Sequence, residues 1–556
     1  MKSAHEQAPH FRAADTPGSD SSSGLNWLEA NSSRLIWLLV FAGIAVRVEQ
    51  YFYNRSLWHD EAMMALNIMH RSFSQLTQPL DFHLVGPLGW LFTEKICTLA
   101  FGNHELALRL PQILSGIATM LLLPVLARRV LPTSGVVIAV AWFAFSRPLI
   151  YYASELKPYG IDALVALLLW CLGFWALDRR LSLFSVAVLA LGGATALWFS
   201  HAALFVLAGI AFTIIASCIA ARDSRRLAAF LPAFVVWASS FALSYTLVLR
   251  NASHDPGLAS SYPFAKFTAH FRDLEAMLES VFVLQQNPVT LLLGVAVLAS
   301  AVGCVYFWRN NRIALGLLLV PILLGLMASG RHHYPLMGRF FIFSAPAVAI
   351  LIAAGAGQFR LATRSSPLPI GAALMVLLFF QPVFSTAEVV IHPIQTTELR
   401  PVLQYVREHQ RPGDIWYVYC YGRFIFEYYV EAYGMDADNV VIGSCFANFR
   451  NSISRDTISA EPTISEPLLT SHPGWRWLRT GNPRYNWNFP EQDFSELRGH
   501  RVWVIFAQIQ TADGVDERAL TLHVLDAMGR QVESHAEPGS VAYLYDLTPA
   551  SSAAAQ

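Results

Sequence analysis

The sequence predicts a polytopic α-helical membrane protein that ends in a soluble α/β domain. Of its 556 residues, 54% are hydrophobic and 14% are charged, values that lie outside the usual range for a soluble globular chain. Apolar runs long enough to span a bilayer recur between about residues 34 and 390. From residue 391 onward the pattern changes to alternating strand-like and helix-like segments with polar turns. These observations divide the chain into a membrane part and a smaller soluble part.

The spans follow a short polar N-terminal tail. Residues 1–33 contain many Ser, Ala, Pro and His residues, and we expect a disordered cytoplasmic tail there. The first apolar run, Leu35 to Phe52, lacks a convincing small-residue cleavage site, so we expect an uncleaved first helix. Later runs bring the total to about eleven spans. They lie at about 108–127, 135–150, 159–177, 182–199, 202–220, 228–249, 288–307, 313–329, 340–359 and 368–388.

The short basic connections between the spans predict the orientation. Under this count they all fall on one side of the membrane, which the positive-inside rule assigns to the cytoplasm. They are Arg128 with Arg129, 178–180, Arg222 with Arg225 and Arg226, Arg309 with Arg312, and Arg360 with Arg364. The outer side therefore receives the loops 54–107, 147–158, 250–287 and 331–339 and the soluble domain 391–556.

Two outer regions are predicted to fold. The loop 54–107 is long and apolar enough for short amphipathic helices at the membrane interface. The soluble domain has alternating helices and strands, which indicate a small α/β domain of about 160 residues. We expect helices at Glu398 to His409, Phe424 to Glu431 and Asp516 to Met528, and strands at Ile415 to Tyr419, Val440 to Ile442, Val502 to Phe506 and Val541 to Tyr545. The stretch 446–500 is typical of an insertion or long loops.

Composition excludes several classes of function. The 39 basic and 39 acidic residues balance, which argues against a nucleic-acid partner, because that would need a strongly basic face. The six cysteines form no CxxC motif and no Cys/His cluster, so neither a zinc site nor a redox motif is predicted. Cys420 and Cys445 lie in the soluble part, and a disulfide between them is possible if that part is outside the cytoplasm.

The chemistry points to the segment Leu57-Trp58-His59-Asp60-Glu61-Ala62, where two carboxylates follow the first span directly. Ionisable residues so close to hydrocarbon suggest a functional site, although a solvated pair at a helix start is the plain alternative. Two other outer features could meet it. They are Glu155 with Lys157, and the run Arg331-His332-His333-Tyr334 with Arg339. An arginine near a membrane end usually anchors lipid headgroups, but beside an outer carboxylate it becomes a plausible clamp for a lipid-borne phosphate.

Four stretches resemble the C-class (GT-C) glycosyltransferases, in particular the protein O-mannosyltransferase and aminoarabinose lipid A transferase group. They are Leu57 to Ala62, Phe101-Gly102 with Glu105-Leu106-Ala107-Leu108-Arg109-Leu110-Pro111, Tyr151 to Tyr159, and Gly338-Arg339-Phe340 through Pro346. The similarity covers roughly residues 35–390, and its most specific parts are the Asp-Glu-Ala signature and the run from Glu105 to Pro111. The resemblance implies a sugar donor linked to polyprenyl monophosphate, an acceptor on the outer side, inversion at the anomeric carbon, and the first-loop aspartate as base.

We therefore expect Asp60 to be the base that takes the acceptor proton, with its basicity raised by partial desolvation. Glu61 would orient it or bind the acceptor, and Glu155 would hold the acceptor or a sugar hydroxyl. The cations expected near the donor phosphate are Lys157, Arg339 and Arg331. Further candidates for substrate binding are His59, His83, Tyr159, His201 and His333.

The sequence departs from the family in the first loop, where a His/Lys-Pro-Pro-Leu run is common. Here the corresponding segment is Val85-Gly86-Pro87-Leu88, with His83 displaced from it. Plain alternatives remain for other candidates, since Glu155 and Lys157 could pair with each other and His332 with His333 could be interfacial. No cofactor is expected. A divalent metal held by Asp60, Glu61 and Glu155 stays open, although three scattered acids are a weak signal.

The expected partners are a polyprenyl-phosphate-sugar donor, the lipid bilayer, and an envelope glycolipid, glycan or protein as acceptor. The expected location is a bacterial inner (plasma) membrane, with the N-terminus in the cytoplasm and the C-terminal domain in the periplasm. The alternative is a transporter or flippase for a lipid-linked or anionic envelope substrate. The absence of an internal repeat, and the few acids in the spans beyond Glu49 and Asp162, count against it. A receptor or scaffold would leave the Asp60-Glu61 pair unexplained.

Overall fold

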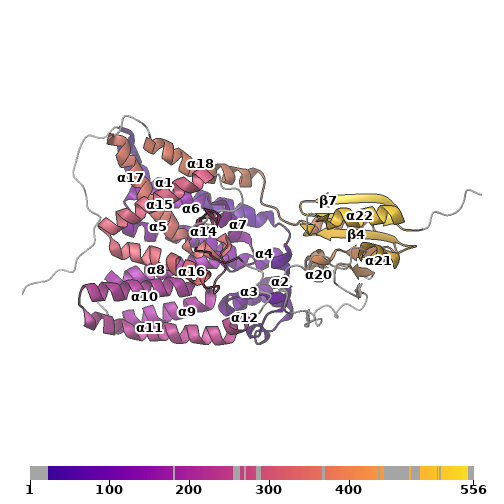
Figure 1. Ribbon diagram of the computed structural model, residues 1–556, viewed down its shortest axis with the longest axis horizontal. Coiled ribbons are helices and arrows are strands. Elements are labelled where there is room, and N and C mark those ends of the chain that lie inside the picture. Colours follow the sequence, from indigo (N-terminus) through magenta and orange to yellow (C-terminus); the bar gives the residue numbers. More distant parts are fainter. Residues whose placement is uncertain are drawn as a thin grey trace, which may run out of the picture.

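The fold has a large helical body with a smaller mixed domain at one end (Figure 1). The computed structural model describes residues 23–178, 182–253, 263–267, 271–282, 290–365, 370–435, 439–443, 475–477, 489–509, 511–512 and 515–548. The chain remains helical, apart from its loops, up to Ile391, and the first strand begins at Ile415.

The sequence predicted about eleven spans, and the described part of the helical body contains nine or ten. Its first helix begins at Ser23, inside the tail 1–33 that was expected to be disordered. Among the described residues, nine helices are long and apolar enough to cross a membrane, and the pair Thr133–Ala144 and Arg147–Ser154, bent by 63°, could form a tenth. The helix Leu183–Phe199 is apolar but shorter. The predicted polytopic helical fold is therefore confirmed. The helices at the predicted span positions are α1 (Ser23–Tyr53), α5 (Leu110–Val130), α6 (Thr133–Ala144), α8 (Tyr159–Asp178), α9 (Leu183–Phe199), α10 (Ala203–Ala220), α11 (Ser224–Ser244), α15 (Thr290–Asn310), α16 (Arg312–Gly330), α17 (Ala345–Ser365) and α18 (Ile370–Ile391).

Helices α15 and α17 pack with their backbones in close approach. A Cβ atom added to Gly303 would lie 2.0 Å from the carbonyl oxygen of Leu351, and one added to Gly355 would lie 1.8 Å from the carbonyl oxygen of Ala299. Membrane helices depend on such small residues because lipid supplies no hydrophobic force to hold them together. The apolar composition of the spans thus predicts the helices, and the glycines fix how closely this pair packs.

The connections at the two ends of the helical body differ. At one end, Arg129 pairs with Asp178, and the Arg226 guanidinium donates a hydrogen bond to the carbonyl of Leu177. Described residues of three predicted basic connections, Arg129, Asp178 and Arg226, thereby lie at the same end of the body. Shorter elements fill the other connections: α2 (His59–His70), η1 (Gln75–Thr77), η2 (Asp81–His83), α3 (Leu88–Phe101), α4 (Glu105–Leu108), α7 (Arg147–Tyr151), η3 (Tyr152–Ser154), the π-helical η4 (Tyr245–Leu249), α12 (Arg250–Ser253), α14 (Phe271–Val281) and η5 (Gly338–Ser344).

The smaller domain is built on a six-stranded mixed sheet in the order β3-β2-β1-β4-β8-β7. The first four strands of this order are parallel, and β8 and β7 are antiparallel to their neighbours. The strands are β1 (Ile415–Val418), β2 (Val440–Ile442), β3 (Trp475–Trp477), β4 (Arg501–Ala507), β7 (Arg530–Glu537) and β8 (Ser540–Asp546), with β5 (Thr511–Ala512) and β6 (Val515–Asp516) as a separate pair. The helices are α19 (Leu399–His409), η6 (Cys420–Gly422), α20 (Arg423–Tyr433), α21 (Phe489–Ser495) and α22 (Glu517–Met528).

The predicted strands and helices of this domain all occur, within a few residues of the expected ends. The strands β3, β5 and β6 and the helix α21 were not predicted, and β3 and α21 lie in the stretch 446–500, where an insertion or long loops were expected. The edge strand β7 was not predicted either. Its sequence, RQVESHAE, lacks the apolar alternation that marks a half-buried strand, because β7 lies at the sheet edge and is largely exposed. Most of the stretch 446–500 lies outside the described residues. Cys420 is disulfide-bonded, whereas Cys445 lies outside the described residues.

The two faces of the sheet belong to different cores. Alternate residues of β1 and β4, such as Val418 and Trp503, pack with α19 and α20 in one continuous core that extends into the membrane helices. The other residues, such as Tyr417 and Val504, pack with α21 and α22 in a second core. Helix α20 contacts α2 directly. The smaller domain is therefore packed against the first loop of the helical body (Figure 1).

Candidate functional site

Asp60 lies in the first turn of α2, seven residues after the end of α1. One carboxylate oxygen, Oδ2, lies 3.7 Å from Nζ of Lys157 and 3.3 Å from Nη1 of Arg339. Lys157 lies two residues before the span that begins at Tyr159, and Arg339 lies at the start of the span Gly338–Phe359. The side chain of Asp60 retains 24% exposure, whereas those of the two cations retain 7% and 15%. Three segments far apart in sequence thus place one carboxylate and two cations at the ends of apolar helices.

The ionisation of Asp60 differs from our expectation. Burial alone would raise its pKa, but the charges of Lys157 and Arg339 outweigh burial and hold the pKa of Asp60 below its ordinary value. The expected rise in basicity is therefore wrong for this structure. The sequence predicted the desolvation, but the two cations are brought in by the tertiary fold.

Glu61 is fully buried and points away from the Asp60 cluster into an ionic network. Its two oxygens accept hydrogen bonds from Nε and Nη2 of Arg109, at 2.9 and 2.7 Å, and Oε1 also accepts from the backbone N–H of Leu156 at 2.7 Å. Nη2 of Arg55 lies 3.6 Å from Oε2. Burial opposes ionisation, but Arg109 and Arg55 hold the pKa of Glu61 below its usual value. The neighbouring acids are thus divided: Glu61 fixes the start of α2 to two other segments, and Asp60 remains accessible.

Glu155 is the second buried acid near this point. Its Oε1 accepts hydrogen bonds from Nε1 of Trp58 at 3.0 Å and from the hydroxyl of Tyr151 at 3.1 Å. Burial, reinforced by the charge of Glu61, raises the pKa of Glu155 to about 7. Its Oε2 is buried and has no hydrogen-bond partner among the described residues. Lys157 pairs with Asp60 and not with Glu155 among the ion pairs of the described chain, which disfavours the plain alternative that these neighbours neutralise each other.

Aromatic rings support the Asp60 cluster from one side. Tyr159 is buried, and its ring packs against Phe340 with 5.6 Å between centroids. The guanidinium of Arg339 lies 5.4 Å from the ring centroid of Phe340 and 6.0 Å from that of Tyr159. Arginine over aromatic faces is held by cation–π attraction. Tyr159 therefore contacts the cluster through Arg339.

The remaining predicted residues are dispersed. Nδ1 of His59 lies 2.9 Å from the carbonyl oxygen of Tyr421 in the smaller domain. His83 is exposed in a turn with positive φ, and Arg331 and His333 are also exposed. His201 lies between α9 and α10, and burial lowers its pKa to about 4. Of these five residues, His59 is the one that is adjacent to Asp60 in the sequence.

Several residues of the site were not predicted. Arg55 and Arg109 neutralise Glu61, and Trp58 holds Glu155. Arg109 carried a signal, because it is the single cation in the run Glu105 to Pro111 that bears the family resemblance. Arg55 could have been identified as a charge between the first span and the Asp60-Glu61 pair, where an ionisable group needs a partner.

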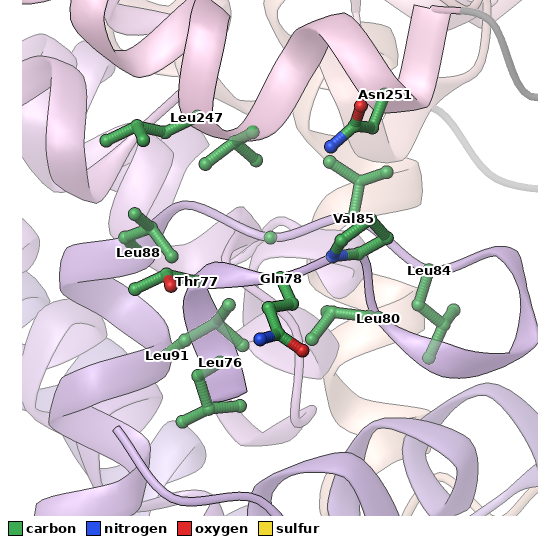
Figure 2. Close-up of a pocket in the computed structure, with 13 residues that line it drawn as sticks. Leu76, Thr77, Gln78, Leu80, Leu84, Val85, Leu88, Leu91, Leu247 and Asn251 are labelled. Carbon is green, nitrogen blue, oxygen red and sulfur yellow. The ribbon is translucent and has the colours of Figure 1, made fainter. Parts of the chain in front are cut away.

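A small apolar pocket lies beside the first loop (Figure 2). It has a volume of about 60 Å³ and is lined by loop residues, including Leu76, Val85 and Leu88, and by Leu247 and Asn251 from the end of α11 and its extension. Pockets that take whole small-molecule ligands are typically about 300–1,000 Å³. The segment Val85 to Leu88, which replaces the family's cationic run, thus contributes apolar side chains here. None of the lining residues belongs to the Asp60 cluster.

Metal binding was left open by the sequence. Within the described parts of the chain, no three or more His, Cys, Asp or Glu side chains are arranged to hold a metal ion. Asp60 pairs with Lys157 and Arg339, and Glu61 pairs with Arg109. These ion pairs occupy the carboxylate oxygens that a metal ion would need as ligands. The donor set of this cluster therefore suits an anion better than a cation.

No family model and no curated protein matches the chain. The solved structure of ArnT from Cupriavidus metallidurans bound to undecaprenyl phosphate is similar over 92% of this chain and 97% of its own, with 11% identity and a TM-score of 0.50. The oligosaccharyltransferase AglB from Archaeoglobus fulgidus, in complex with an inhibitory peptide and a dolichol-phosphate, is similar over 93% and 74%, with 11% identity and a TM-score of 0.48.

Another Archaeoglobus fulgidus oligosaccharyltransferase structure, a complex with Zn and sulfate, is similar over 71% of this chain at 13% identity and a TM-score of 0.44, and the chain spans 61% of its length. At these identities the likeness concerns the fold alone. The membrane fold of this chain is thus the one seen in ArnT, as the resemblance to the GT-C class predicted.

Proposed function

We propose that this chain is a membrane glycosyltransferase that moves a sugar from a polyprenyl-phosphate donor to an acceptor on the periplasmic face. The observation that carries the proposal is the cluster of Asp60, Lys157 and Arg339 at the ends of apolar helices. A donor whose lipid tail lies in the bilayer can bring its phosphate to this level, where two cations can take it. The similarity of the fold to ArnT, a structure that holds undecaprenyl phosphate, supports the same conclusion.

The proposed reaction is an inverting transfer. The acceptor atom attacks the anomeric carbon from the side opposite the phosphate, a new bond forms there, and the carbon–oxygen bond to the phosphate breaks. The electron pair of that bond remains on the polyprenyl phosphate, whose charge Lys157 and Arg339 stabilise. Asp60 accepts the proton that the acceptor loses. General-base assistance of this kind is typically worth about 10²–10⁴-fold in rate.

The pairing of Asp60 with both cations suggests an order of events. In the geometry described above, Lys157 and Arg339 lower the pKa of Asp60 and weaken it as a base. A bound donor phosphate would draw the same cations toward its own oxygens, because arginine and lysine pair well with phosphate. The pKa of Asp60 would then rise through its burial. Donor binding would therefore activate the base before the acceptor is deprotonated.

The other acids have separate roles in this proposal. Glu61 positions the start of α2 through Arg109 and stays ionised. Glu155 presents a buried oxygen, Oε2, that can accept a hydrogen bond from a sugar or acceptor hydroxyl. The periplasmic orientation is supported by the basic connections that gather at the opposite end of the bundle.

The test is a donor-consumption assay with purified protein in lipid nanodiscs. Polyprenyl-phosphate-linked pentoses and hexoses are supplied together with an extract of envelope glycolipids and glycans, and mass spectrometry follows the loss of donor and the release of free polyprenyl phosphate. We expect consumption of at least one donor in an extract-dependent manner. A protein that moves an intact lipid-linked donor between leaflets without cleaving it would be a flippase, and the proposal would be wrong.

A further inference from the structure

The backbone just before Asp60 is held by the smaller domain. Residues 54–58 join α1 to α2 without regular structure. The backbone N–H of Ser56 donates to Oε2 of Glu398 at 2.9 Å, and that of Leu57 donates to the hydroxyl of Tyr429 at 2.8 Å. Ser56 and Leu57 are completely buried, so these donors have no access to water. The helical body thus depends on α20 and the start of α19 to satisfy two buried N–H groups next to the proposed base.

The carbonyl groups of the same segment are satisfied by arginines from two sources. Nη2 of Arg400, in α19, donates to the carbonyl of Asn54 at 2.7 Å. Nη1 of Arg109, in the helical body, donates to the carbonyl of Arg55 at 2.7 Å. Buried backbone groups need such partners because an unpaired one costs about as much as a lost hydrogen bond. The conformation of residues 54–57 therefore depends on contacts from both domains.

Glu105 connects these contacts into one network. It is fully buried, and its Oε1 accepts hydrogen bonds from the hydroxyl of Tyr429 at 2.9 Å and from Nη1 of Arg400 at 2.7 Å. A tyrosine hydroxyl has one proton to donate and lone pairs to accept. The hydroxyl of Tyr429 donates its proton to Glu105 and accepts from the N–H of Leu57. That orientation is fixed, because the carboxylate can only accept and the N–H can only donate.

We propose that Tyr429 is a positioning residue for Asp60, and that the smaller domain is for this reason a working part of the catalytic site. The inference rests on the proposed function. Leu57 lies three residues before Asp60, so the hydrogen bond from its N–H sets where α2 begins. That position in turn sets the reach of the Asp60 carboxylate toward Lys157 and Arg339. A displacement of about 1 Å at a reacting group can cost on the order of 10²-fold in rate.

The chain offers a matched control on the same helix. Tyr428 is also completely buried, and its hydroxyl donates to the carbonyl of Asn103 at 2.8 Å, away from residues 54–58. Tyr429→Phe and Tyr428→Phe each remove one buried hydroxyl from α20. Tyr429→Phe leaves the N–H of Leu57 without its acceptor, whereas Tyr428→Phe leaves the segment before Asp60 intact. Glu398→Ala removes the acceptor of the Ser56 N–H. It therefore removes a second contact to the same segment, made at the start of α19, and it serves as the alternative variant if Tyr429→Phe fails to fold.

The experiment measures kcat and donor KM for full-length protein in nanodiscs, together with amide hydrogen exchange over residues 54–62. For Tyr429→Phe and Glu398→Ala we expect kcat to fall about 10-fold or more, donor KM to change less than about twofold, and exchange over 54–62 to accelerate. For Tyr428→Phe we expect a similar loss of thermal stability, with kcat and exchange over 54–62 unchanged.

Two results would overturn the inference: kcat values that fall equally in Tyr429→Phe and Tyr428→Phe, or exchange over 54–62 that stays at the wild-type rate in both Tyr429→Phe and Glu398→Ala. A wild-type protein that consumes no polyprenyl-phosphate sugar would instead contradict the proposed function. The exchange measurement needs no activity, so in that case it still decides whether Tyr429 holds the segment.

Discussion

The guanidinium of Arg339 lies 3.3 Å from the carboxylate of Asp60, although 279 positions separate them in the sequence. The pair brings the proposed base, in the first loop, into contact with the proposed phosphate ligand at the start of the span Gly338–Phe359. Together with the larger effect of Lys157, it holds the pKa of Asp60 below its ordinary value in spite of burial. It also means that the two halves of the proposed reaction, proton removal and phosphate release, are electrostatically coupled.

Asp60→Asn should reduce turnover by at least about 10²-fold, because the amide keeps the size of the carboxylate but cannot accept the acceptor proton. Donor binding should be largely retained, since loss of a base affects the transition state more than the ground state. Steady-state kinetics and a donor-binding titration measure the two effects. Near-normal turnover in well-folded Asp60→Asn protein would show that the base is misassigned.

Arg339→Ala should raise the donor KM, and Arg339→Lys should recover it in part, because a point charge cannot contact two phosphate oxygens as a planar guanidinium does. Arg331→Ala is the control. Arg331 was also predicted to bind phosphate, but it is exposed. We therefore expect the donor KM of the Arg331→Ala protein to stay within about twofold of the wild-type value. If the two alanine variants changed the donor KM equally, the result would favour the alternative that Arg339 anchors lipid headgroups.

The pH profile should report the contact between Arg339 and Asp60. The base works when deprotonated, so kcat/KM falls as pH falls through the pKa of Asp60 in the free enzyme. Arg339 helps to hold that pKa below its ordinary value. In Arg339→Ala the pKa should rise, and the fall in kcat/KM should begin at a higher pH than in the wild type. An acid limb that does not move would contradict a direct effect of this arginine on the base.

The substitutions Glu155→Gln and Glu61→Gln should change the thermal stability of the protein in opposite directions at pH 8. The pKa of Glu155 is about 7 in the folded protein, above its usual value near 4.3. The unfolded chain therefore ionises first, and the folded state loses stability as pH rises between these values. Glu155→Gln removes this loss, so its midpoint of thermal unfolding should exceed that of the wild type at pH 8, by a larger margin than at pH 5.

Glu61→Gln is the matched substitution for the opposite sign. The pKa of Glu61 is lowered in the folded state, so its ion pairs stabilise the fold above the unfolded pKa and are lost as pH falls through the folded pKa. At pH 8 the variant leaves Arg109 buried without its charged partner, which is strongly destabilising. Its midpoint should fall below that of the wild type at pH 8. Shifts of the same sign in both variants would contradict this assignment of the two acids.

A reporter at the C-terminus tests the orientation. Alkaline phosphatase folds and becomes active outside the cytoplasm, so a full-length fusion after Gln556 should show phosphatase activity in intact cells. A reporter that is active only in the cytoplasm, fused at the same position, should be inactive. The reverse result would place the Asp60 cluster on the cytoplasmic side and contradict both the topology and the use of a periplasmic acceptor.

The sequence by itself was sufficient for the membrane class, for most elements of the smaller domain, and for Asp60 as a candidate. The physical reason is that these features are local. Hydrocarbon requires long apolar helices, strand and helix periods are visible within a few residues, and two acids beside a span stand out because charge there is costly. The edge strand β7 (Arg530–Glu537) escaped prediction because its side chains are largely exposed and leave no apolar alternation.

Only the tertiary structure decided how the charges pair. Asp60 and Glu61 are adjacent in sequence, yet one faces Lys157 and Arg339 and the other is enclosed by Arg109 and Arg55. Successive residues of a helix point in different directions, so the packing of remote segments decides which cation each acid meets. The same packing reversed the expected shift in the pKa of Asp60. It also brought Tyr429 of the smaller domain to the backbone of Leu57, a contact between segments that no local pattern connects.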